Sequence, residues 1–206
     1  MISDFLRHLF PRVVIERNLR FTYTFCLGGL AFSSLLILVA TGLLLVIYYQ
    51  PTPERAFSSI IFLESSVHGG RYIRSLHRLS SHIFLILIFL HTLRVLLTGA
   101  YRKPRELNWV IGCIILCSAV FCAYTGYLLP MDQLSLWATQ TGMELVRAAP
   151  FGEQIRAILV PDGVGEAMSL LRFYALHIIL VPLLLIILSL LHFYQIRKNR
   201  GVLPYL

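Results

Sequence analysis

Long apolar runs alternate with short polar segments along this chain. Four of the runs are long enough to cross about 30 Å of hydrocarbon as helices. They cover approximately residues 22–49, 76–100, 107–129 and 173–196. Of the 206 residues, 57% are hydrophobic and only 14% are charged, which is typical of membrane proteins. We therefore predict an all-α membrane protein, built as a bundle of four transmembrane helices.

The polar segments between these runs predict short surface helices. Residues 1–20 alternate apolar residues with arginines, as in an amphipathic arm that lies in the membrane interface. Residues 57–62 predict a short surface helix, and the runs 134–145 and 151–159 predict two amphipathic helices. Both runs lie in the segment 131–172, and a segment of that length without a span is more often functional than a mere connection.

The basic residues are distributed by side of the membrane. Placing the N-terminus inside collects ten of the 18 Lys and Arg residues on one side. These ten are Arg7, Arg12, Arg17, Arg20, Arg102, Lys103, Arg105, Arg197, Lys198 and Arg200. By the positive-inside rule, we expect an even number of spans with both termini on the cytoplasmic (n) side. The net charge of +8 follows this topology and does not indicate binding to nucleic acid.

Four histidines form two similarly spaced pairs in the second and fourth predicted spans. His77 and His91 are fourteen residues apart, and His177 and His192 are fifteen apart. At about 100° per residue, either spacing returns a side chain to within about 40–60° of its starting face and rises about 21–23 Å. On antiparallel helices the imidazoles would meet in two pairs, which is a way to hold two six-coordinate haem irons. A lone membrane histidine is more often structural or a proton relay, and His82 keeps that interpretation.

Glycines repeat with the same period in the other two spans. Gly28 and Gly42 are fourteen residues apart, and so are Gly112 and Gly126. Glycine removes side-chain bulk, so the edge of a flat macrocycle could reach the backbone at these levels. A single membrane glycine is more often a helix-packing residue, but four at the histidine period favour a cofactor.

Arginines lie near the ends of the histidine pairs. They are Arg74, Arg78, Arg94 and Arg197. A guanidinium group can bind a haem propionate bidentately, although snorkelling to lipid headgroups explains any one of them nearly as well.

The cysteines form no CxxC or CxxCH motif. They therefore indicate neither a zinc site nor an ordinary double-thioether haem. They are Cys26, Cys113, Cys117 and Cys122, all in or beside predicted spans. A membrane cysteine is most often a small apolar filler, and we keep that interpretation for the three in the third span.

Several stretches of the sequence together resemble those of a known protein family. Span by span, the chain resembles the haem-bearing four-helix core of cytochrome b from quinol-oxidising bc-type complexes. The matching stretches are residues 40–42, 73–78, 91–94, 103–107, 125–130 and 171–177, within a resemblance that covers roughly residues 18–201. The chain is most similar to the split cytochrome b6 type, because it ends after the fourth span, has a second histidine spacing of fifteen, and matches a b6 stretch at residues 25–29.

The resemblance implies specific haem ligands. His77 and His177 would ligate a b haem near the outer (p) face, and His91 and His192 a b haem near the inner (n) face. Cys26 would attach a third haem through a single thioether, beside the inner b haem. Residues 21–201 would then form a haem domain enclosed by the four-helix bundle, between the arm 1–20 and a tail 202–206.

One segment departs from the family pattern. The family usually has a tryptophan after the proline that closes the third span, whereas here Pro130 is followed by Met131, Asp132 and Gln133. In the family this segment borders the outer quinol site, so Met131 replaces the usual tryptophan at a position next to the expected quinol.

The family's activity gives the expected function. The resemblance implies a subunit of a quinol:electron-acceptor oxidoreductase that carries electrons between quinol oxidation at the p side and quinone reduction at the n side, supporting a proton gradient. The later spans of full-length cytochrome b, with their Pro-Glu-Trp-Tyr motif, have no counterpart here. We therefore expect activity only in a complex, dimeric as a whole, with a companion membrane subunit and a Rieske iron–sulfur or cytochrome c-type subunit. We favour the bacterial plasma membrane over the thylakoid.

Two other functions use similar features. A dihaem b membrane anchor of a dehydrogenase or hydrogenase also pairs membrane histidines, but is not expected to reproduce the glycine pairs or the segments 103–106 and 130–133. A haem-free packing or transport subunit would use the histidines as proton relays. A reduced-minus-oxidised spectrum separates the haem-free alternative from the others.

Overall fold

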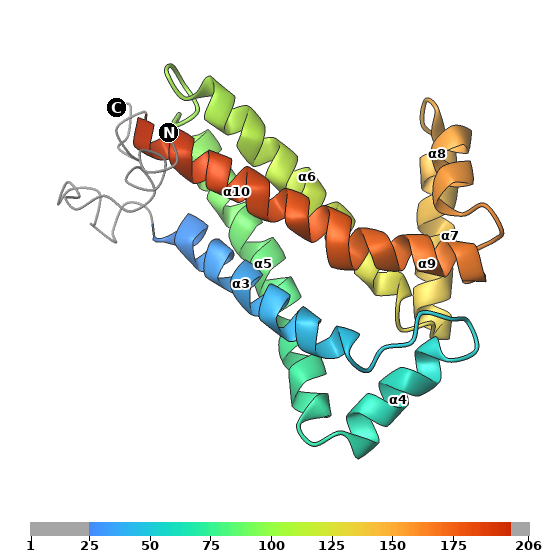
Figure 1. Ribbon diagram of the computed structural model, residues 1–206. Coiled ribbons are helices and arrows are strands. Elements are labelled where there is room, and N and C mark those ends of the chain that lie inside the picture. Colours follow the sequence, from blue (N-terminus) through green and yellow to red (C-terminus); the bar gives the residue numbers. More distant parts are fainter. Residues whose placement is uncertain (1–24, 199–206) are drawn as a thin grey trace, which may run out of the picture. The chain divides into compact units, whose positions relative to one another are not determined.

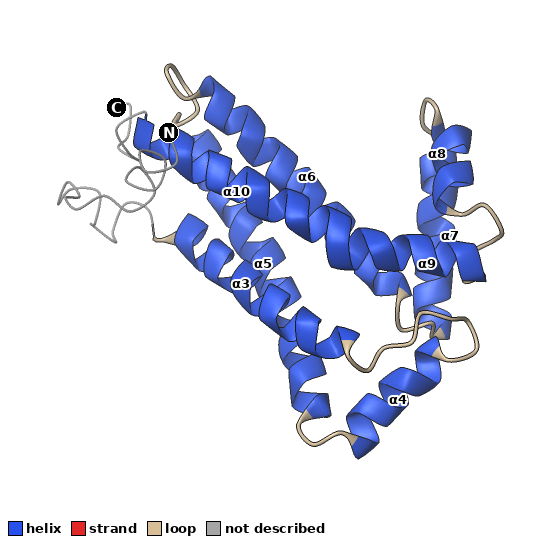
Figure 2. Cartoon of the chain, viewed as in Figure 1, coloured by secondary structure: helices blue, strands red, loops and turns tan. Residues whose placement is uncertain are grey.

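The structure of the protein is a computed structural model, which describes residues 25–198 (Figure 1). Within that range all regular structure is helical (Figure 2). The helices are α3 (Leu27–Val46), α4 (Ala56–Ser66), α5 (Gly70–Leu97), α6 (Glu106–Leu128), α7 (Gln133–Arg147), α8 (Gly152–Leu159), α9 (Ala167–Ala175), the π-helical turn η2 (Leu176–Leu180) and α10 (Val181–Lys198).

Four helices are long and apolar enough to cross a membrane, which confirms the predicted spans. They are Leu27–Val46, Gly70–Leu97, Glu106–Leu128 and the continuous helix Ala167–Lys198. Many of their large apolar side chains are exposed, such as Leu43 and Leu97, and hydrocarbon would cover these in a bilayer. The chain is an integral membrane protein. The predicted arm 1–20 and tail 202–206 lie outside the described residues.

The chain divides into two compact units, and each contains part of every spanning helix. Unit 1 comprises residues 1–36, 81–119 and 183–206, and unit 2 comprises residues 37–80 and 120–182. The helices predicted at residues 57–62, 134–145 and 151–159 form in unit 2 as α4, α7 and α8. Each unit holds one of the two histidine pairs.

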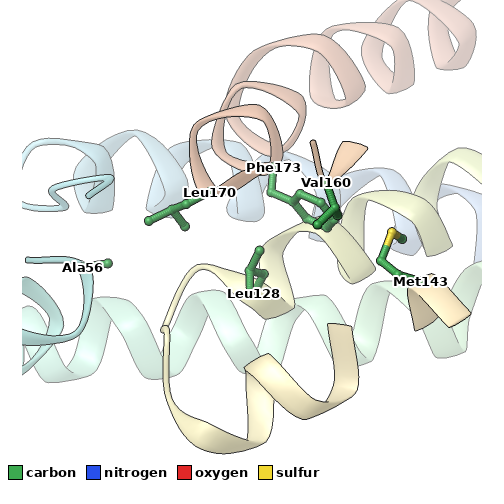
Figure 3. Packing of buried hydrophobic residues seen from close by; sticks show 6 residues of the cluster. All are labelled: Ala56, Leu128, Met143, Val160, Leu170 and Phe173. Carbon is green, nitrogen blue, oxygen red and sulfur yellow. The ribbon is translucent and has the colours of Figure 1, made fainter. Parts of the chain in front are cut away.

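Unit 2 has a buried apolar cluster that holds its short helices together (Figure 3). Its members are Ala56, Leu128, Met143, Val160, Leu170 and Phe173. They come from α4, α6, α7, the segment after α8, and α9, so elements far apart in the sequence share one core. The phenol of Tyr49 packs at its edge, where it stacks on Tyr174 and donates a 2.7 Å hydrogen bond to the carbonyl of Leu129. Burial raises the pKa of Tyr49, so the phenol stays protonated and can donate.

Local sequence signals account for several helix ends. The carboxylate of Asp132 accepts a 2.8 Å hydrogen bond from the backbone N–H of Ser135, which caps the N-terminus of α7. Gly99 follows α5 with φ of 64°, the left-handed conformation that a helix C-terminus favours. The amide of Ala100 then bonds back to the carbonyl of Val95 at 3.1 Å.

The fourth span contains one π-helical turn, η2, which begins one residue before His177. The amide of Val181 donates to the carbonyl of Leu176, five residues back, instead of four. Pro182 follows directly. Its nitrogen cannot donate and its ring crowds the carbonyl four residues earlier, so a widened turn before it is a natural accommodation.

The π turn accounts for the unequal histidine spacings. A π turn takes in one more residue than an α turn, so the helix beyond it continues as if one residue were absent. The fifteen residues from His177 to His192 therefore correspond to fourteen in a uniform α-helix, the spacing of His77 and His91 on α5. In uniform α-helices, the spacings of fourteen and fifteen residues would differ by about 100° in the direction of the second histidine relative to the first.

Deleting one residue from the π turn should therefore be tolerated. We expect deletion of Ile179, which is exposed, to convert η2 to α-helix and to keep the haem content of the purified protein unchanged. Deletion of the similarly exposed Ile86, between His77 and His91 on α5, removes a residue from a regular helix and rotates one histidine by about 100° relative to the other. That variant should lose haem in a pyridine haemochrome assay. Equal haem loss in both deletions would contradict this role of the π turn.

Candidate functional site

The structure brings the four predicted histidines together in two pairs, one in each unit. In unit 2, His77 on α5 faces His177 in η2, with ring centroids 6.3 Å apart and ring planes at 78°. In unit 1, His91 on α5 faces His192 on α10, with centroids 6.3 Å apart and planes at 79°. The two pairs therefore have nearly the same geometry.

That geometry fits two axial ligands on one metal. With a metal–nitrogen distance of about 2.0 Å and each ring nitrogen about 1.1 Å from its centroid, two imidazoles on opposite sides of one metal have centroids about 6.2 Å apart. No group of three or more His, Cys, Asp or Glu side chains suited to a metal occurs among residues 25–198. Two ligands per metal is what a planar macrocycle with four nitrogens of its own requires.

Each of the four periodic glycines faces one of these imidazoles. A Cβ at Gly28 would lie 3.1 Å from His91 Cε1, and one at Gly42 would lie 3.4 Å from His77 Cε1. At Gly112 the distance to His192 Cε1 would be 3.4 Å, and at Gly126 the distance to His177 Cε1 would be only 2.4 Å.

These contacts add a second role for the glycines. The sequence predicts that the edge of a macrocycle reaches the backbone at these levels, and in the structure an imidazole ring also faces each glycine. A Cβ would press on the histidine ring at Gly126 and would be tight at Gly28, whereas at Gly42 and Gly112 it would come close to ordinary contact. The glycines therefore set how closely each histidine approaches the neighbouring helix.

Hydrogen bonds fix the protonation of both imidazoles in unit 2. The hydroxyl of Thr41 donates to the carbonyl of Ile37 at 2.7 Å, so its oxygen is left to accept from Nδ1–H of His77 at 2.9 Å. His177 Nδ1 lies 2.9 Å from the carbonyl oxygen of Cys122, which can only accept. Both rings then carry their proton on Nδ1, and the lone pair of each Nε2 remains available for a metal.

Within residues 25–198, the imidazoles of His91 and His192 in unit 1 have fewer hydrogen bonds than those in unit 2. Nδ1 of His192 is buried and has no hydrogen-bond partner among the described residues. The side-chain oxygen of Asn108, near the start of α6, is likewise buried without a partner in the described part of the chain.

The predicted arginines have different surroundings. Arg74 forms an ion pair with Glu64 of α4, both in unit 2, and sequence reasoning had not singled out Glu64. Arg78 is exposed on α5. Arg94 lies in the last turn of α5 with guanidinium nitrogens buried, and Arg197 lies in the last turn of α10.

The remaining predicted residues lie at helix boundaries. Cys26 is exposed, has φ of 50°, and directly precedes α3. Met131 has φ of 53°, in the turn between α6 and α7, and its side chain lies against Gly165. Asp132 is the N-cap of α7 and Gln133 is its first residue, while Pro130 lies in the turn that follows α6. In this structure the 130–133 segment therefore connects α6 to α7 and caps α7.

Sequence reasoning missed the polar groups that hold the imidazoles. A usable signal was present at Thr41 and Thr125, which directly precede Gly42 and Gly126. Thr125 Oγ1 lies 3.5 Å from His177 Nδ1 and donates to the carbonyl of Cys122 at 2.9 Å. A hydroxyl beside each of these glycines could have been read as a partner for the histidine opposite.

A known protein family matches this chain. The model of the cytochrome b/b6/petB family matches residues 14–200, which is nearly the whole chain. The chain belongs to the cytochrome b/b6 family. It is therefore a b-type cytochrome, and b-type haem binding follows from membership of the family.

Curated relatives of this cytochrome b agree with the family match. The chain is 43% identical over 174 residues to cytochrome b6 of Heliomicrobium gestii, covering 84% of this chain and 82% of that one. It is 38% identical over 202 residues to the menaquinol:cytochrome c reductase cytochrome b subunit of Bacillus subtilis (strain 168), covering 97% and 90%.

A solved structure shares the fold. A chain of a hyperthermophilic respiratory complex III matches with a TM-score of 0.82 and 25% sequence identity. The match covers 98% of this cytochrome b and 52% of the solved chain, so this chain spans about half the length of that one.

Adding a methyl group at the glycines should harm the two sides of the unit 2 pair unequally. Gly126→Ala places a Cβ within 2.4 Å of His177, a separation that real contacts do not tolerate, so α6 or the imidazole must move. Gly42→Ala places its Cβ 3.4 Å from His77, which is close to ordinary contact. We expect Gly126→Ala to lose about half of the b-type α-band and Gly42→Ala to keep nearly all of it. The reverse order would show that these contacts do not position the histidines.

Proposed function

We propose that this chain is the haem-bearing cytochrome b6-like subunit of a membrane quinol oxidoreductase. It would carry electrons between quinol oxidation at the p side and quinone reduction at the n side, and so support a proton gradient. The observation that carries the proposal is that His77 faces His177 and His91 faces His192, with ring centroids 6.3 Å apart in both cases. The relatives are named as cytochrome b6 and as a menaquinol:cytochrome c reductase subunit, which supports this function over a dehydrogenase anchor or a haem-free transporter.

Each pair would hold one b haem. His77 and His177 would ligate the p-side haem, and His91 and His192 the n-side haem. When bound, each haem supplies one-electron transfer. The chain's own part would be to supply the imidazole Nε2 atoms that hold each haem and to keep the proton of each imidazole on Nδ1, as the hydrogen bonds of His77 to Thr41 and of His177 to Cys122 do in unit 2.

Charged residues would bind the propionates at the ends of these sites. Arg78, Arg94 and Arg197 are the candidates whose described positions place them in or beside the turns that carry the histidines. Arg74 would have to exchange its ion pair with Glu64 for a propionate or share its guanidinium between the two carboxylates. Removal of Glu64 would then strengthen the hold of Arg74 on a propionate.

A third haem would be attached to Cys26. The thiol is exposed, so it is accessible to a vinyl group, and it lies in unit 1 two residues before Gly28, which faces His91. A single thioether would place this covalent c-type haem beside the n-side b haem, where it would extend the path toward quinone.

The outer quinol site would be bordered by the turn at Pro130, Met131, Asp132 and Gln133. This turn is fixed by the cap on α7 and by the buried cluster of unit 2. Half of such a site would come from a companion membrane subunit that carries later cytochrome b helices. We further propose a Rieske iron–sulfur or cytochrome c-type subunit as electron acceptor, a dimeric complex, both termini on the n side, and a location in the bacterial plasma membrane.

Histidine variants test the haem assignment. The purified chain should show a b-type α-band in its reduced-minus-oxidised spectrum, with two haems per polypeptide after correction for any covalent haem. Either His177→Ala or His192→Ala should remove about half of this band, and the double variant should remove nearly all of it. His82→Ala, on the exposed face of α5, serves as the matched control and should keep the full band. The absence of any b-type band from the wild-type protein would rule out this function.

A denaturing gel tests the covalent haem. Peroxidase staining should travel with the wild-type polypeptide, because a thioether survives denaturation whereas axial ligation does not. Cys26→Ala should abolish the stain and leave the b-type α-band in place. Cys113→Ala, on α6, should keep the stain. A stain that persists in Cys26→Ala would disprove attachment at this residue.

A further inference from the structure

The environments of the two histidines that face α6 differ in one respect. Each lies against a glycine of that helix, His177 against Gly126 and His192 against Gly112. Nδ1 of His177 has a carbonyl partner at 2.9 Å, whereas Nδ1 of His192 faces the backbone carbonyl of Asn108 without a hydrogen bond of good geometry among the described residues. A buried N–H without an acceptor carries its full desolvation cost, so an acceptor for His192 is expected nearby.

The residue four positions before each glycine lies next to the histidine opposite. Cys122, four residues before Gly126, supplies the carbonyl that accepts from His177, and its Sγ lies 3.7 Å from the same Nδ1. A side chain at this helical position therefore reaches the ring nitrogen of the histidine opposite. Residues four apart share one face of a helix, so the same relation holds one repeat earlier on α6.

Asn108 occupies the corresponding position, four residues before Gly112. Its backbone carbonyl faces the imidazole of His192, as the carbonyl of Cys122 faces His177. Asn108 is only 8% exposed, and its Oδ1 is buried with no donor among the described residues. In unit 1 the backbone of Asn108 thus faces the His192 ring, and the amide oxygen of Asn108 and Nδ1 of His192 each lack a hydrogen-bond partner among the described residues.

We infer that Asn108 is a positioning residue for the n-side haem, whose side-chain oxygen accepts the hydrogen bond from Nδ1–H of His192. This inference depends on the proposed function, because it concerns a histidine in its role as an axial ligand. The bond would hold the proton on Nδ1, leave Nε2 for iron, and fix the orientation of the ring. It would also increase the electron density that the imidazole gives to iron, which favours the oxidised haem.

A redox titration of the whole protein tests this role. In Asn108→Leu, which keeps the size but removes the acceptor, the ratio of reduced to oxidised n-side haem at a fixed ambient potential should rise about three- to tenfold. In Asn108→Asp, which keeps an acceptor oxygen, the ratio should stay at or below that of the wild-type protein. The p-side haem in the same molecules should not change in either variant.

Thr41→Val is the matched control for assigning the two haems. It removes the acceptor of His77 in unit 2, so it should shift the p-side component and leave the n-side component unchanged. If Asn108→Leu prevents binding of the n-side haem, retention of that haem in Asn108→Asp supports the inference, and its loss in both variants overturns it. Unchanged titration of both haems in Asn108→Leu would also overturn it, with the backbone carbonyl as the remaining acceptor.

Failure of this inference is distinguishable from failure of the proposed function. A wild-type protein with two b haems that titrate identically in Asn108→Leu refutes only the role of Asn108. A wild-type protein without any b-type band refutes the proposed function, and the inference with it.

Discussion

The contact between an imidazole ring and a glycine backbone is the constraint on which both histidine pairs depend. Each of the four histidines lies against a glycine of a neighbouring spanning helix, with ring carbons 2.4 to 3.4 Å from the place a Cβ would take. The absence of a side chain lets the imidazole approach the helix backbone, where carbonyl oxygens are available to its Nδ1. The same contact holds each ring at the distance from its partner that one metal between two nitrogens requires.

Polar groups beside these glycines determine the chemistry of the rings. In unit 2, the hydroxyl of Thr41 and the carbonyl of Cys122 each accept a hydrogen bond from an Nδ1–H group, so both Nε2 atoms are left with lone pairs. In a hydrocarbon setting such bonds matter more than they would near water, because no solvent can replace a missing acceptor. Unit 1 has different residues at the corresponding place, where we infer that the side chain of Asn108 supplies the acceptor for His192.

Unit 2 also contains the elements that would carry substrate chemistry. The short helices α4, α7, α8 and α9 are joined there by one buried cluster around Leu128 and Phe173. The turn that follows α6 is held between that cluster and the cap on α7. This turn belongs to the same unit as the His77–His177 pair, whereas the exposed side chains of the spanning helices are mostly apolar.

Sequence periodicity alone determined the four spans, the two histidine pairs and the matching glycines. Hydrophobic length and the helical repeat are local properties, so they can be read without knowing which helices are neighbours. The surface helices α4, α7 and α8 were predictable for the same reason. Tertiary structure decided which imidazole faces each glycine, because that depends on which two helices are neighbours. It also decided that Arg74 pairs with Glu64 and that Thr41 bonds to His77, contacts between residues far apart in the chain. The π turn before Pro182 likewise became visible only in the folded backbone, although the extra residue between His177 and His192 had already marked its place.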